Sequence, residues 1–138
     1  MADLIHDLIL STAQRVPNNT TLSYKGDQQS YGHLAAAVLA YARSLTETAG
    51  LERDERVAVY LEKRPEAVVG LFGAAAAGGV FVPVNPLLKP PQVGYILRDC
   101  NVRVLVTSAS RLEQLGDELS HCHDLHTVVV VDGPPMDP

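Results

Sequence analysis

Four side chains that could bind a metal lie close together near the end of the chain. The sequence places His121, Cys122, His123 and His126 within six positions, and imidazole and thiolate groups are common zinc ligands. Their H-C-H-x-x-H spacing matches no standard zinc signature, and the group straddles the end of a predicted helix. Positive side chains at such an end interact favourably with the helix dipole. We therefore interpret the group as a solvated helix end and predict no metal site.

The loop Glu62-Lys63-Arg64 is the best-placed candidate for binding a ligand or cofactor. It follows the apolar run 57–61, which is too short for a helix and typical of a buried parallel strand. Ligands of open α/β sheets usually bind beyond the carboxyl ends of the strands. The alternative is that these three residues form only a charged turn. No catalytic residue is predicted anywhere in the sequence.

The common phosphate-binding and nucleophile motifs do not occur in this sequence. It has no Gly-Lys-Ser/Thr string of a Walker loop. Gly70, Gly73, Gly78 and Gly79 lie in or at the end of a predicted helix, where close packing explains them better than a dinucleotide fingerprint does. There is no G-x-S-x-G elbow, and Cys100 falls on the apolar face of a predicted helix, as expected for a core residue.

The composition is that of one globular domain. Of 138 residues, 46% are hydrophobic and 20% are charged, and 11 basic side chains against 16 acidic ones give a net charge of -5. This excludes intrinsic disorder and argues against nucleic acid as the main partner, because phosphate binding needs a basic face. Two cysteines cannot form a disulfide framework, and Asp3 and Asp7 stand where a signal peptide would carry basic residues. We predict a cytoplasmic location.

Residues 67–88 form a stretch without any charged side chain. A stretch of this length is long enough to span a bilayer. The stretch is interrupted by glycines and prolines, and Gly78-Gly79 is followed by a Val-Phe-Val-Pro-Val run. We therefore predict a helix, a turn and a buried strand, with no membrane span.

The rest of the pattern predicts the elements that position these residues. The first part should hold a helix over 3–15, a β-hairpin over 21–31 and a helix over 31–48 capped by Gly50. The second part should alternate strands at 57–61, 80–84, 102–107 and 126–131 with helices at 65–77, 91–100 and 110–121. Such alternation predicts an α/β fold in which a largely parallel sheet is covered by helices. Residues 1–132 form a single domain in this prediction, and 133–138 are a Pro-rich tail or a truncation point.

Two strings resemble the core motifs of the adenylate-forming (AMP-binding) enzymes. SYGHLAAAVLAYARSL at 30–45 is similar to their first motif, usually Ser/Thr-Tyr-x-Glu-Leu, and LFGAAAAGGVFVPVNPLL at 71–88 is similar to their second. The order of the elements over 3–132 matches as well. This superfamily includes acyl-CoA synthetases, peptide-synthetase adenylation domains and luciferases. The run from 74 to 108 looks most similar to AMP-forming acyl-CoA ligases of the exosortase-associated type.

One position departs from the first motif. The family's Glu is His33 here, three residues after Ser30, the predicted N-cap. A histidine reproduces the second hydrogen bond of a capping box less well than a glutamate does. We expect this change to cost well under about 1 kcal/mol of helix stability.

The resemblance implies an incomplete part of the large N-terminal domain of the adenylate-forming fold. The parent would be an ATP-dependent acyl-CoA ligase, an acid-thiol ligase that activates a carboxylic acid as acyl-AMP and transfers it to CoA, using ATP, Mg and CoA. The family's phosphate-gripping loop, magnesium-associated Glu and adenylation Lys come later than the region seen here. The resemblance therefore implies a scaffold that is inactive alone, holds no cofactor and has the remainder of the same chain as its partner. Which acid is used, and whether CoA or a carrier protein accepts it, stays open.

A second hypothesis is a free-standing α/β interaction or regulatory module that acts without catalysis. Under the first hypothesis, later segments cover the sheet, and a shortened chain exposes apolar faces and unpaired strand edges. We therefore expect the fragment to self-associate by edge pairing or by exchange of a terminal element.

Overall fold

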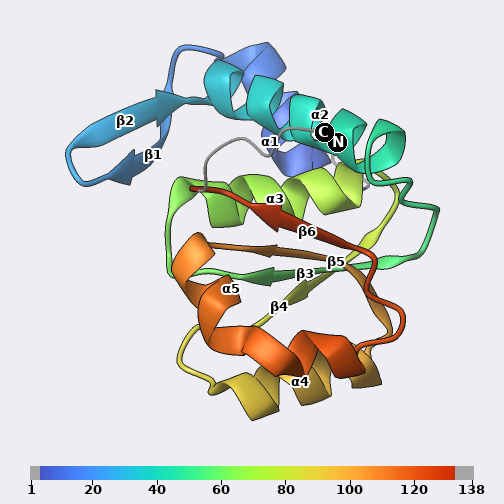
Figure 1. Cartoon of the computed structure of the whole chain (residues 1–138). Helices are drawn as coiled ribbons and strands as arrows, with labels where there is room; N and C mark the ends of the chain where they lie inside the picture. The colour runs from blue at the N-terminus through green and yellow to red at the C-terminus, as the bar shows by residue number, and fades with distance from the viewer. Residues whose placement is uncertain (1–3, 133–138) are drawn as a thin grey trace.

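The computed structural model describes residues 4–132, in which a four-stranded parallel sheet lies between layers of helices (Figure 1). The spatial order of the strands is β4-β3-β5-β6, and each neighbouring pair runs parallel. The predicted α/β class with a largely parallel sheet is confirmed. The strands are β3 (Arg56–Tyr60), β4 (Val80–Pro83), β5 (Val102–Thr107) and β6 (Thr127–Val130).

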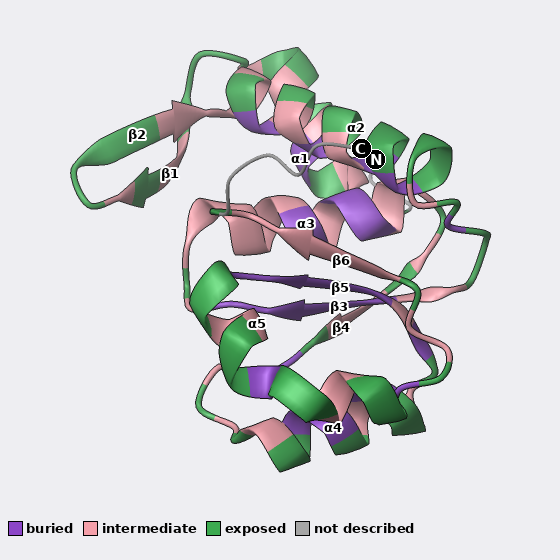
Figure 2. Cartoon of the chain, viewed as in Figure 1, coloured by how far each residue is buried: buried purple, intermediate pink, exposed green. Residues whose placement is uncertain are grey.

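Both faces of this sheet are covered. Helix α3 (Pro65–Ala76) packs on one face, α2 (Tyr31–Glu47) packs against α3, and α1 (Asp7–Arg15) packs against α2. The other face is covered by α4 (Pro90–Asp99), α5 (Ala109–Leu115) and the 3₁₀ helix η1 (Gly116–His121). As a result of this cover, β3 and β5 in the middle of the sheet are buried over most of their length (Figure 2). A strand buried on both faces must be almost entirely apolar, which is the pattern seen in the sequence.

Alternate residues of the two central strands fill two separate cores. Ala58, Tyr60 and Leu105 belong to the core on the α4 side. Their neighbours along the strands belong to the core on the α3 side, namely Val57, Val59, Val104 and Val106. This division follows from the pleat of a β-strand, which points successive side chains to opposite faces.

A β-hairpin precedes α2, as predicted. Strands β1 (Thr20–Tyr24) and β2 (Asp27–Ser30) pair antiparallel around Lys25 and Gly26, whose φ angles are 50° and 87°. Two positive φ angles match the twist that a two-residue hairpin turn requires. Ser30 then starts α2, and its Oγ accepts a hydrogen bond from the His33 N–H at 3.2 Å. The predicted N-cap is confirmed.

Two predicted helices have different bounds in the structure. The first was expected over 3–15 but begins at Asp7 within the described residues. The second is predicted as one helix over 110–121. This prediction is wrong beyond Leu115, because the α-helix ends there and the 3₁₀ helix η1 follows. Gly116 has a φ of 45° at this point, a conformation that interrupts an α-helix and is open to glycine, which lacks a Cβ. The predicted tail at 133–138 lies outside the described residues.

The uncharged stretch 67–88 forms a helix, a turn and a strand. It contains most of α3, the Gly78-Gly79 turn and β4. Across residues 4–132, no helix combines the length and hydrophobicity needed to cross a bilayer. The predicted order of elements here is confirmed. The prediction that the strand is buried is wrong, because β4 is an edge strand whose residues are exposed or half-buried.

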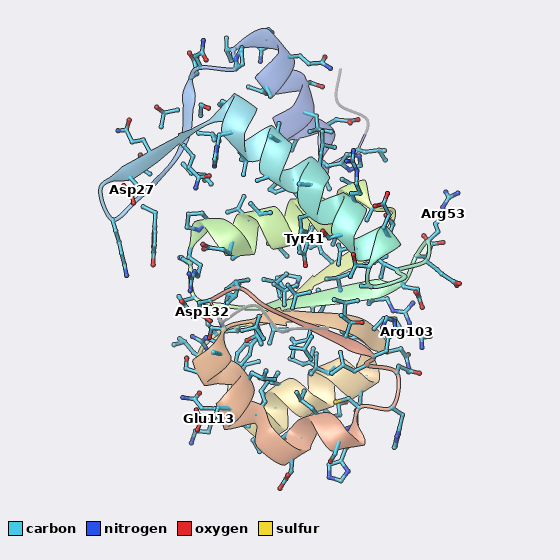
Figure 3. The ribbon with its side chains drawn as sticks, turned by 45° about the horizontal axis from the view of Figure 1, so that its top comes forward. Asp27, Tyr41, Arg53, Arg103, Glu113 and Asp132 are labelled. Atoms are coloured by element: carbon cyan, nitrogen blue, oxygen red, sulfur yellow. The ribbon has the colours of Figure 1, made fainter. Side chains whose placement is uncertain are left out.

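Two glycines of α3 allow close packing. Gly73 is buried where the Tyr41 ring of α2 crosses α3, and a Cβ at this position would collide with Cδ1 of that ring (Figure 3). Gly70, one turn earlier, lies against the sheet, where a Cβ would come 3.2 Å from Cγ2 of Val59. The interpretation of these two glycines as packing residues is confirmed.

The contact between Gly73 and Tyr41 predicts a specific loss of stability. Gly73→Ala should be less stable than Gly70→Ala by about 1–2 kcal/mol, because overpacking a buried contact costs about 1–3 kcal/mol. Both variants gain the same helix propensity, so Gly70→Ala is a matched control. Urea denaturation followed by circular dichroism measures the difference. Equal stabilities for the two variants would contradict the packing argument.

Candidate functional site

The loops that leave the strands meet at the carboxyl edge of the sheet. The four strands of the parallel sheet all run toward this edge, and the arrows of β3, β5 and β6 in Figure 1 point to it. Glu62, Lys63 and Arg64 follow β3 there, as the sequence predicted, and Asp132 follows β6 at the same edge (Figure 3). The placement of the three candidates is therefore confirmed, and their role in binding a ligand stays a prediction.

The Glu62 carboxylate lies between two arginines. Its Oε1 is 3.1 Å from Nη1 of Arg64, and its Oε2 is 3.3 Å from Nε of Arg111. Arg64 forms a second and shorter contact, 2.7 Å from its Nε to Oε2 of Glu66. The charges of Glu62 and Arg64 are thus satisfied by each other, by Glu66 of α3 and by Arg111 of α5.

Arg111 connects three parts of this edge. Besides Glu62, its Nη1 donates a hydrogen bond to the carbonyl oxygen of Pro86 at 2.9 Å. Its guanidinium carbon lies 4.8 Å from the centre of the Tyr60 ring, within the range of a cation–π contact. The Tyr60 hydroxyl in turn donates to the carbonyl oxygen of Leu88 at 2.9 Å. The loops after β3 and β4 are therefore fixed to the start of α5.

Asp132 fixes the end of β6 to the same group. Its Oδ1 accepts a hydrogen bond from the Ala109 N–H at 2.8 Å, and its Oδ2 is 3.8 Å from Nη1 of Arg64. The Ala109 N–H belongs to the first turn of α5, where negative charge is favoured by the helix dipole. Ser108, the N-cap of α5, accepts a bond from the Arg111 N–H at 3.3 Å. These charged and polar contacts join the end of β6 and the loop after β3 to the start of α5.

These contacts shift the acidity of the groups involved. The pKa of Glu62 is lowered mainly by a hydrogen bond from its own backbone N–H, and Arg111 and Arg64 lower it further against partial burial. The hydrogen bond from Arg64 lowers the pKa of Glu66, and the pKa of Arg64 is raised in return. The ionised forms of all three groups are therefore stabilised.

Lys63 differs from its two neighbours. It is exposed and has no hydrogen-bond or ion-pair partner within residues 4–132. It lies at the rim of a groove of about 440 Å³ between β1 and α3, whose wall includes Leu22, Val68 and Leu71. An ammonium group beside an apolar groove can attract an anion, which makes Lys63 the most accessible of the three candidates.

The potential metal ligands do not converge. Within the described part of the chain, no three His, Cys, Asp or Glu side chains are arranged to hold a metal ion. The interpretation of the whole group as solvated is wrong for Cys122, which is buried in the core on the α4 side. Its thiol donates to the carbonyl oxygen of Glu118 at 3.4 Å, and burial raises its pKa. His121 and His123 are exposed on either side of it. Cys100 is half-buried against the core on the α4 side.

Sequence reasoning missed Arg111 and Asp132. Asp132 follows β6 as Glu62 follows β3, so the rule about carboxyl ends of strands would have found it. Arg111 carried no comparable signal, because it meets Glu62 only through a contact across 49 positions.

The same arrangement of hairpin, helices and parallel sheet is found in known enzymes. The family model described as AMP-binding enzyme matches residues 10–138. The chain belongs to the AMP-binding enzyme family. This confirms the resemblance of the two core motifs to adenylate-forming enzymes, and the fold matches the N-terminal domain of those enzymes.

Three known proteins of this family give the scale of the similarity. The structure of the anthranilate CoA ligase AuaEII in complex with anthranoyl-AMP matches with a TM-score of 0.87 and 26% identity, over 93% of this chain and 25% of that one. Tyrocidine synthase 3 of Brevibacillus parabrevis is 31% identical over 125 residues, which is 88% of this chain and 2% of that protein. A long-chain-fatty-acid–CoA ligase of Bacillus subtilis (strain 168) is 32% identical over 103 residues, 75% of this chain and 18% of that protein. The chain spans a quarter or less of the length of these proteins.

The lowered pKa of Glu62 predicts how this edge responds to acid. The ionised carboxylate stabilises the fold above its ordinary pKa of 4.5, and this contribution is lost as the pH falls through the lower pKa of the folded state. Glu62→Gln should therefore destabilise the protein at pH 7 and have little effect at pH 3. Solvent screens this side chain, which is 45% exposed, so we expect a loss below about 1 kcal/mol.

Glu113→Gln is the matched control, because Glu113 lies on the exposed side of α5 (Figure 3). Urea denaturation at the two pH values measures both variants. A Glu62→Gln loss that is the same at pH 3 and pH 7 would contradict the charge network.

Proposed function

We propose that this chain is the N-terminal scaffold of an ATP-dependent acyl-CoA ligase. The whole enzyme joins a carboxylic acid to ATP, releases pyrophosphate, and transfers the acyl group of the acyl-AMP to the thiol of CoA with release of AMP. The observation that carries the proposal is the match to the anthranilate CoA ligase that holds anthranoyl-AMP, with a TM-score of 0.87 over 93% of this chain. ATP, Mg and CoA are cofactors of the longer enzyme in this proposal, and its location is cytoplasmic.

The charge distribution at the carboxyl edge supports a scaffold role. Acid activation depends on positive groups and backbone donors that hold phosphates and offset developing charge. Arg64 and Arg111, the two arginines of this edge, are paired with Glu62 and Glu66 instead. Their contacts hold loops in place. The chemistry of the enzyme then belongs to other segments of its chain.

Among the three candidates from the sequence, Lys63 is the one that we assign to ligand contact. Glu62 and Arg64 act as positioning residues, because they hold the loop through ion pairs of 3.1 Å and 2.7 Å. Lys63 extends beside an apolar groove without such a partner in the described residues. This arrangement suits the negatively charged part of a molecule bound near the edge.

A second candidate function has its own support. Tyrocidine synthase 3 is 31% identical over 125 residues, which favours an adenylation domain of a peptide synthetase, with a carrier-protein thiol as acceptor.

The continuation of the reading frame distinguishes the ligase from the free-standing module of the second hypothesis. A reading frame that continues past Pro138 into a Ser/Thr-Gly-rich Pro-Lys-Gly loop supports the ligase, and a stop codon there supports the module.

The proposal predicts the activity of the protein encoded by the continuing reading frame. With Mg-ATP and a panel of carboxylic acids it should release pyrophosphate only when its acid is present, and mass spectrometry should detect the acyl-CoA ester when free CoA is added. Acyl transfer to a carrier-bound thiol alone would identify a peptide-synthetase domain instead. A protein that releases no pyrophosphate with any acid of the panel would contradict both.

A further inference from the structure

The position of Lys63 depends on its neighbours in the chain, because its own side chain has no partner among residues 4–132. Leu61, two residues before it, is buried in the core on the α3 side. Glu62 and Arg64, on either side of it, form the ion pairs of the loop. The place at which Lys63 leaves the loop is therefore set by the contacts that hold Glu62 and Arg64.

The contacts of Arg64 do little to fix this loop to the rest of the edge. Its short ion pairs reach Glu62 at 3.1 Å and Glu66 at 2.7 Å, and both partners lie within two residues of it. Such local pairs keep the shape of the loop, but they move together with it. The ion pair of Arg64 with a more distant part of the chain, Asp132, is longer at 3.8 Å.

Arg111 supplies the directed contact from outside the loop. Its Nε lies 3.3 Å from Oε2 of Glu62, and its Nη1 donates to the carbonyl oxygen of Pro86 at 2.9 Å. Its guanidinium also lies against the ring of Tyr60, which is only 2% exposed and whose hydroxyl donates to the carbonyl oxygen of Leu88. A planar cation that is stacked on a buried ring and bonded in two directions has little freedom to turn. Arg111 therefore determines where Glu62 stands relative to the sheet.

We propose that Arg111 is a positioning residue of the enzyme, which holds Lys63 where its ammonium group meets an anionic group of a substrate, either a phosphate or a carboxylate. The inference rests on the proposed ligase function and on the assignment of Lys63 to ligand contact. Arg111 acts through Glu62 and makes no contact of its own with the substrate. Because a bound group must be held in the right place, a displaced loop weakens binding of the substrate that Lys63 contacts.

Steady-state kinetics of the enzyme encoded by the continuing reading frame test this proposal, with Mg-ATP, the carboxylic acid and CoA varied in turn. Lys63→Ala should raise the KM of one of these substrates. Arg111→Met should raise the same KM at least about fivefold and change kcat less than about twofold, as expected when binding is lost and the chemical step is not.

Arg103→Met is the matched control, because Arg103 also forms two ion pairs, at the amino edge of the same sheet. It should leave that KM unchanged. Equal increases in KM for Arg111→Met and Arg103→Met would overturn the proposal, because they would indicate a general loss of stability. Lys63→Ala without an effect on any KM would overturn it as well.

A double variant separates a positioning role from a direct one. If Arg111 acts through Lys63, the enzyme that carries both Lys63→Ala and Arg111→Met should have the KM of Lys63→Ala alone, within about twofold. Increases in KM that multiply in the double variant would overturn the proposal, because the two residues would then act independently.

Arg111→Lys provides the test where Arg111→Met does not fold. A lysine keeps the charge but cannot make two directed bonds from a planar group, so it should still raise the same KM at least about threefold. Arg111→Lys with the KM of the unchanged enzyme would overturn the inference. An unchanged enzyme that releases no pyrophosphate would overturn the proposed function and the inference with it. An active enzyme whose KM values do not respond to either Arg111 variant would overturn the inference alone.

Discussion

The pairing of β3 with β5 is the constraint on which the rest of this structure depends. Both strands are buried, with Val57, Ala58, Val104 and Leu105 fully excluded from solvent. A parallel ladder of this kind needs cover on both faces, and the crossover connections between its strands supply it. The helices α3, α4 and α5 are these connections. Gly73 then lets α2 lie close against α3, so that the hairpin and α1 are carried as an outer layer.

The same pairing explains why charged residues gather at both ends of the sheet. Parallel strands bring all their carboxyl ends to one edge, where Glu62, Arg64, Arg111 and Asp132 form one network. At the amino edge, Nε of Arg103 in β5 lies 3.1 Å from Oε2 of Glu55, and its Nη1 lies 3.1 Å from Oδ1 of Asp124. Figure 3 labels Arg103 at this edge. Charged side chains excluded from the buried strands thus join the loops around them. The result is an edge with fixed loops, which suits a part of an enzyme that supports a site.

The sequence predicted most elements because local patterns determine them. Short apolar runs identified the four strands of the sheet, and the Pro65 and Gly78-Gly79 signals placed α3 within one residue at its end. The break at Gly116 was missed, because the leucines at 112, 115 and 119 continue a helical spacing through it. A glycine permits such a break but does not require one.

Prediction of the candidate site was limited in a different way. The rule for α/β sheets placed Glu62, Lys63 and Arg64 at the correct edge. It did not indicate that Glu62 is also paired with Arg111, because that contact joins residues 49 positions apart. The histidines near Cys122 show the reverse case, since neighbours in sequence do not converge in space. Side-chain partners over long separations are determined by tertiary packing, which one sequence does not display.

The scaffold role is tested most directly by calorimetric titration of the 138-residue chain with Mg-ATP and, separately, with CoA. Paired arginines at the carboxyl edge and the absence of a Walker string from the sequence predict no heat of binding for either ligand at micromolar concentrations. Micromolar binding of Mg-ATP would contradict the scaffold role. It would show a phosphate site within this chain, and substitution of Lys63 would then be the first step in locating it.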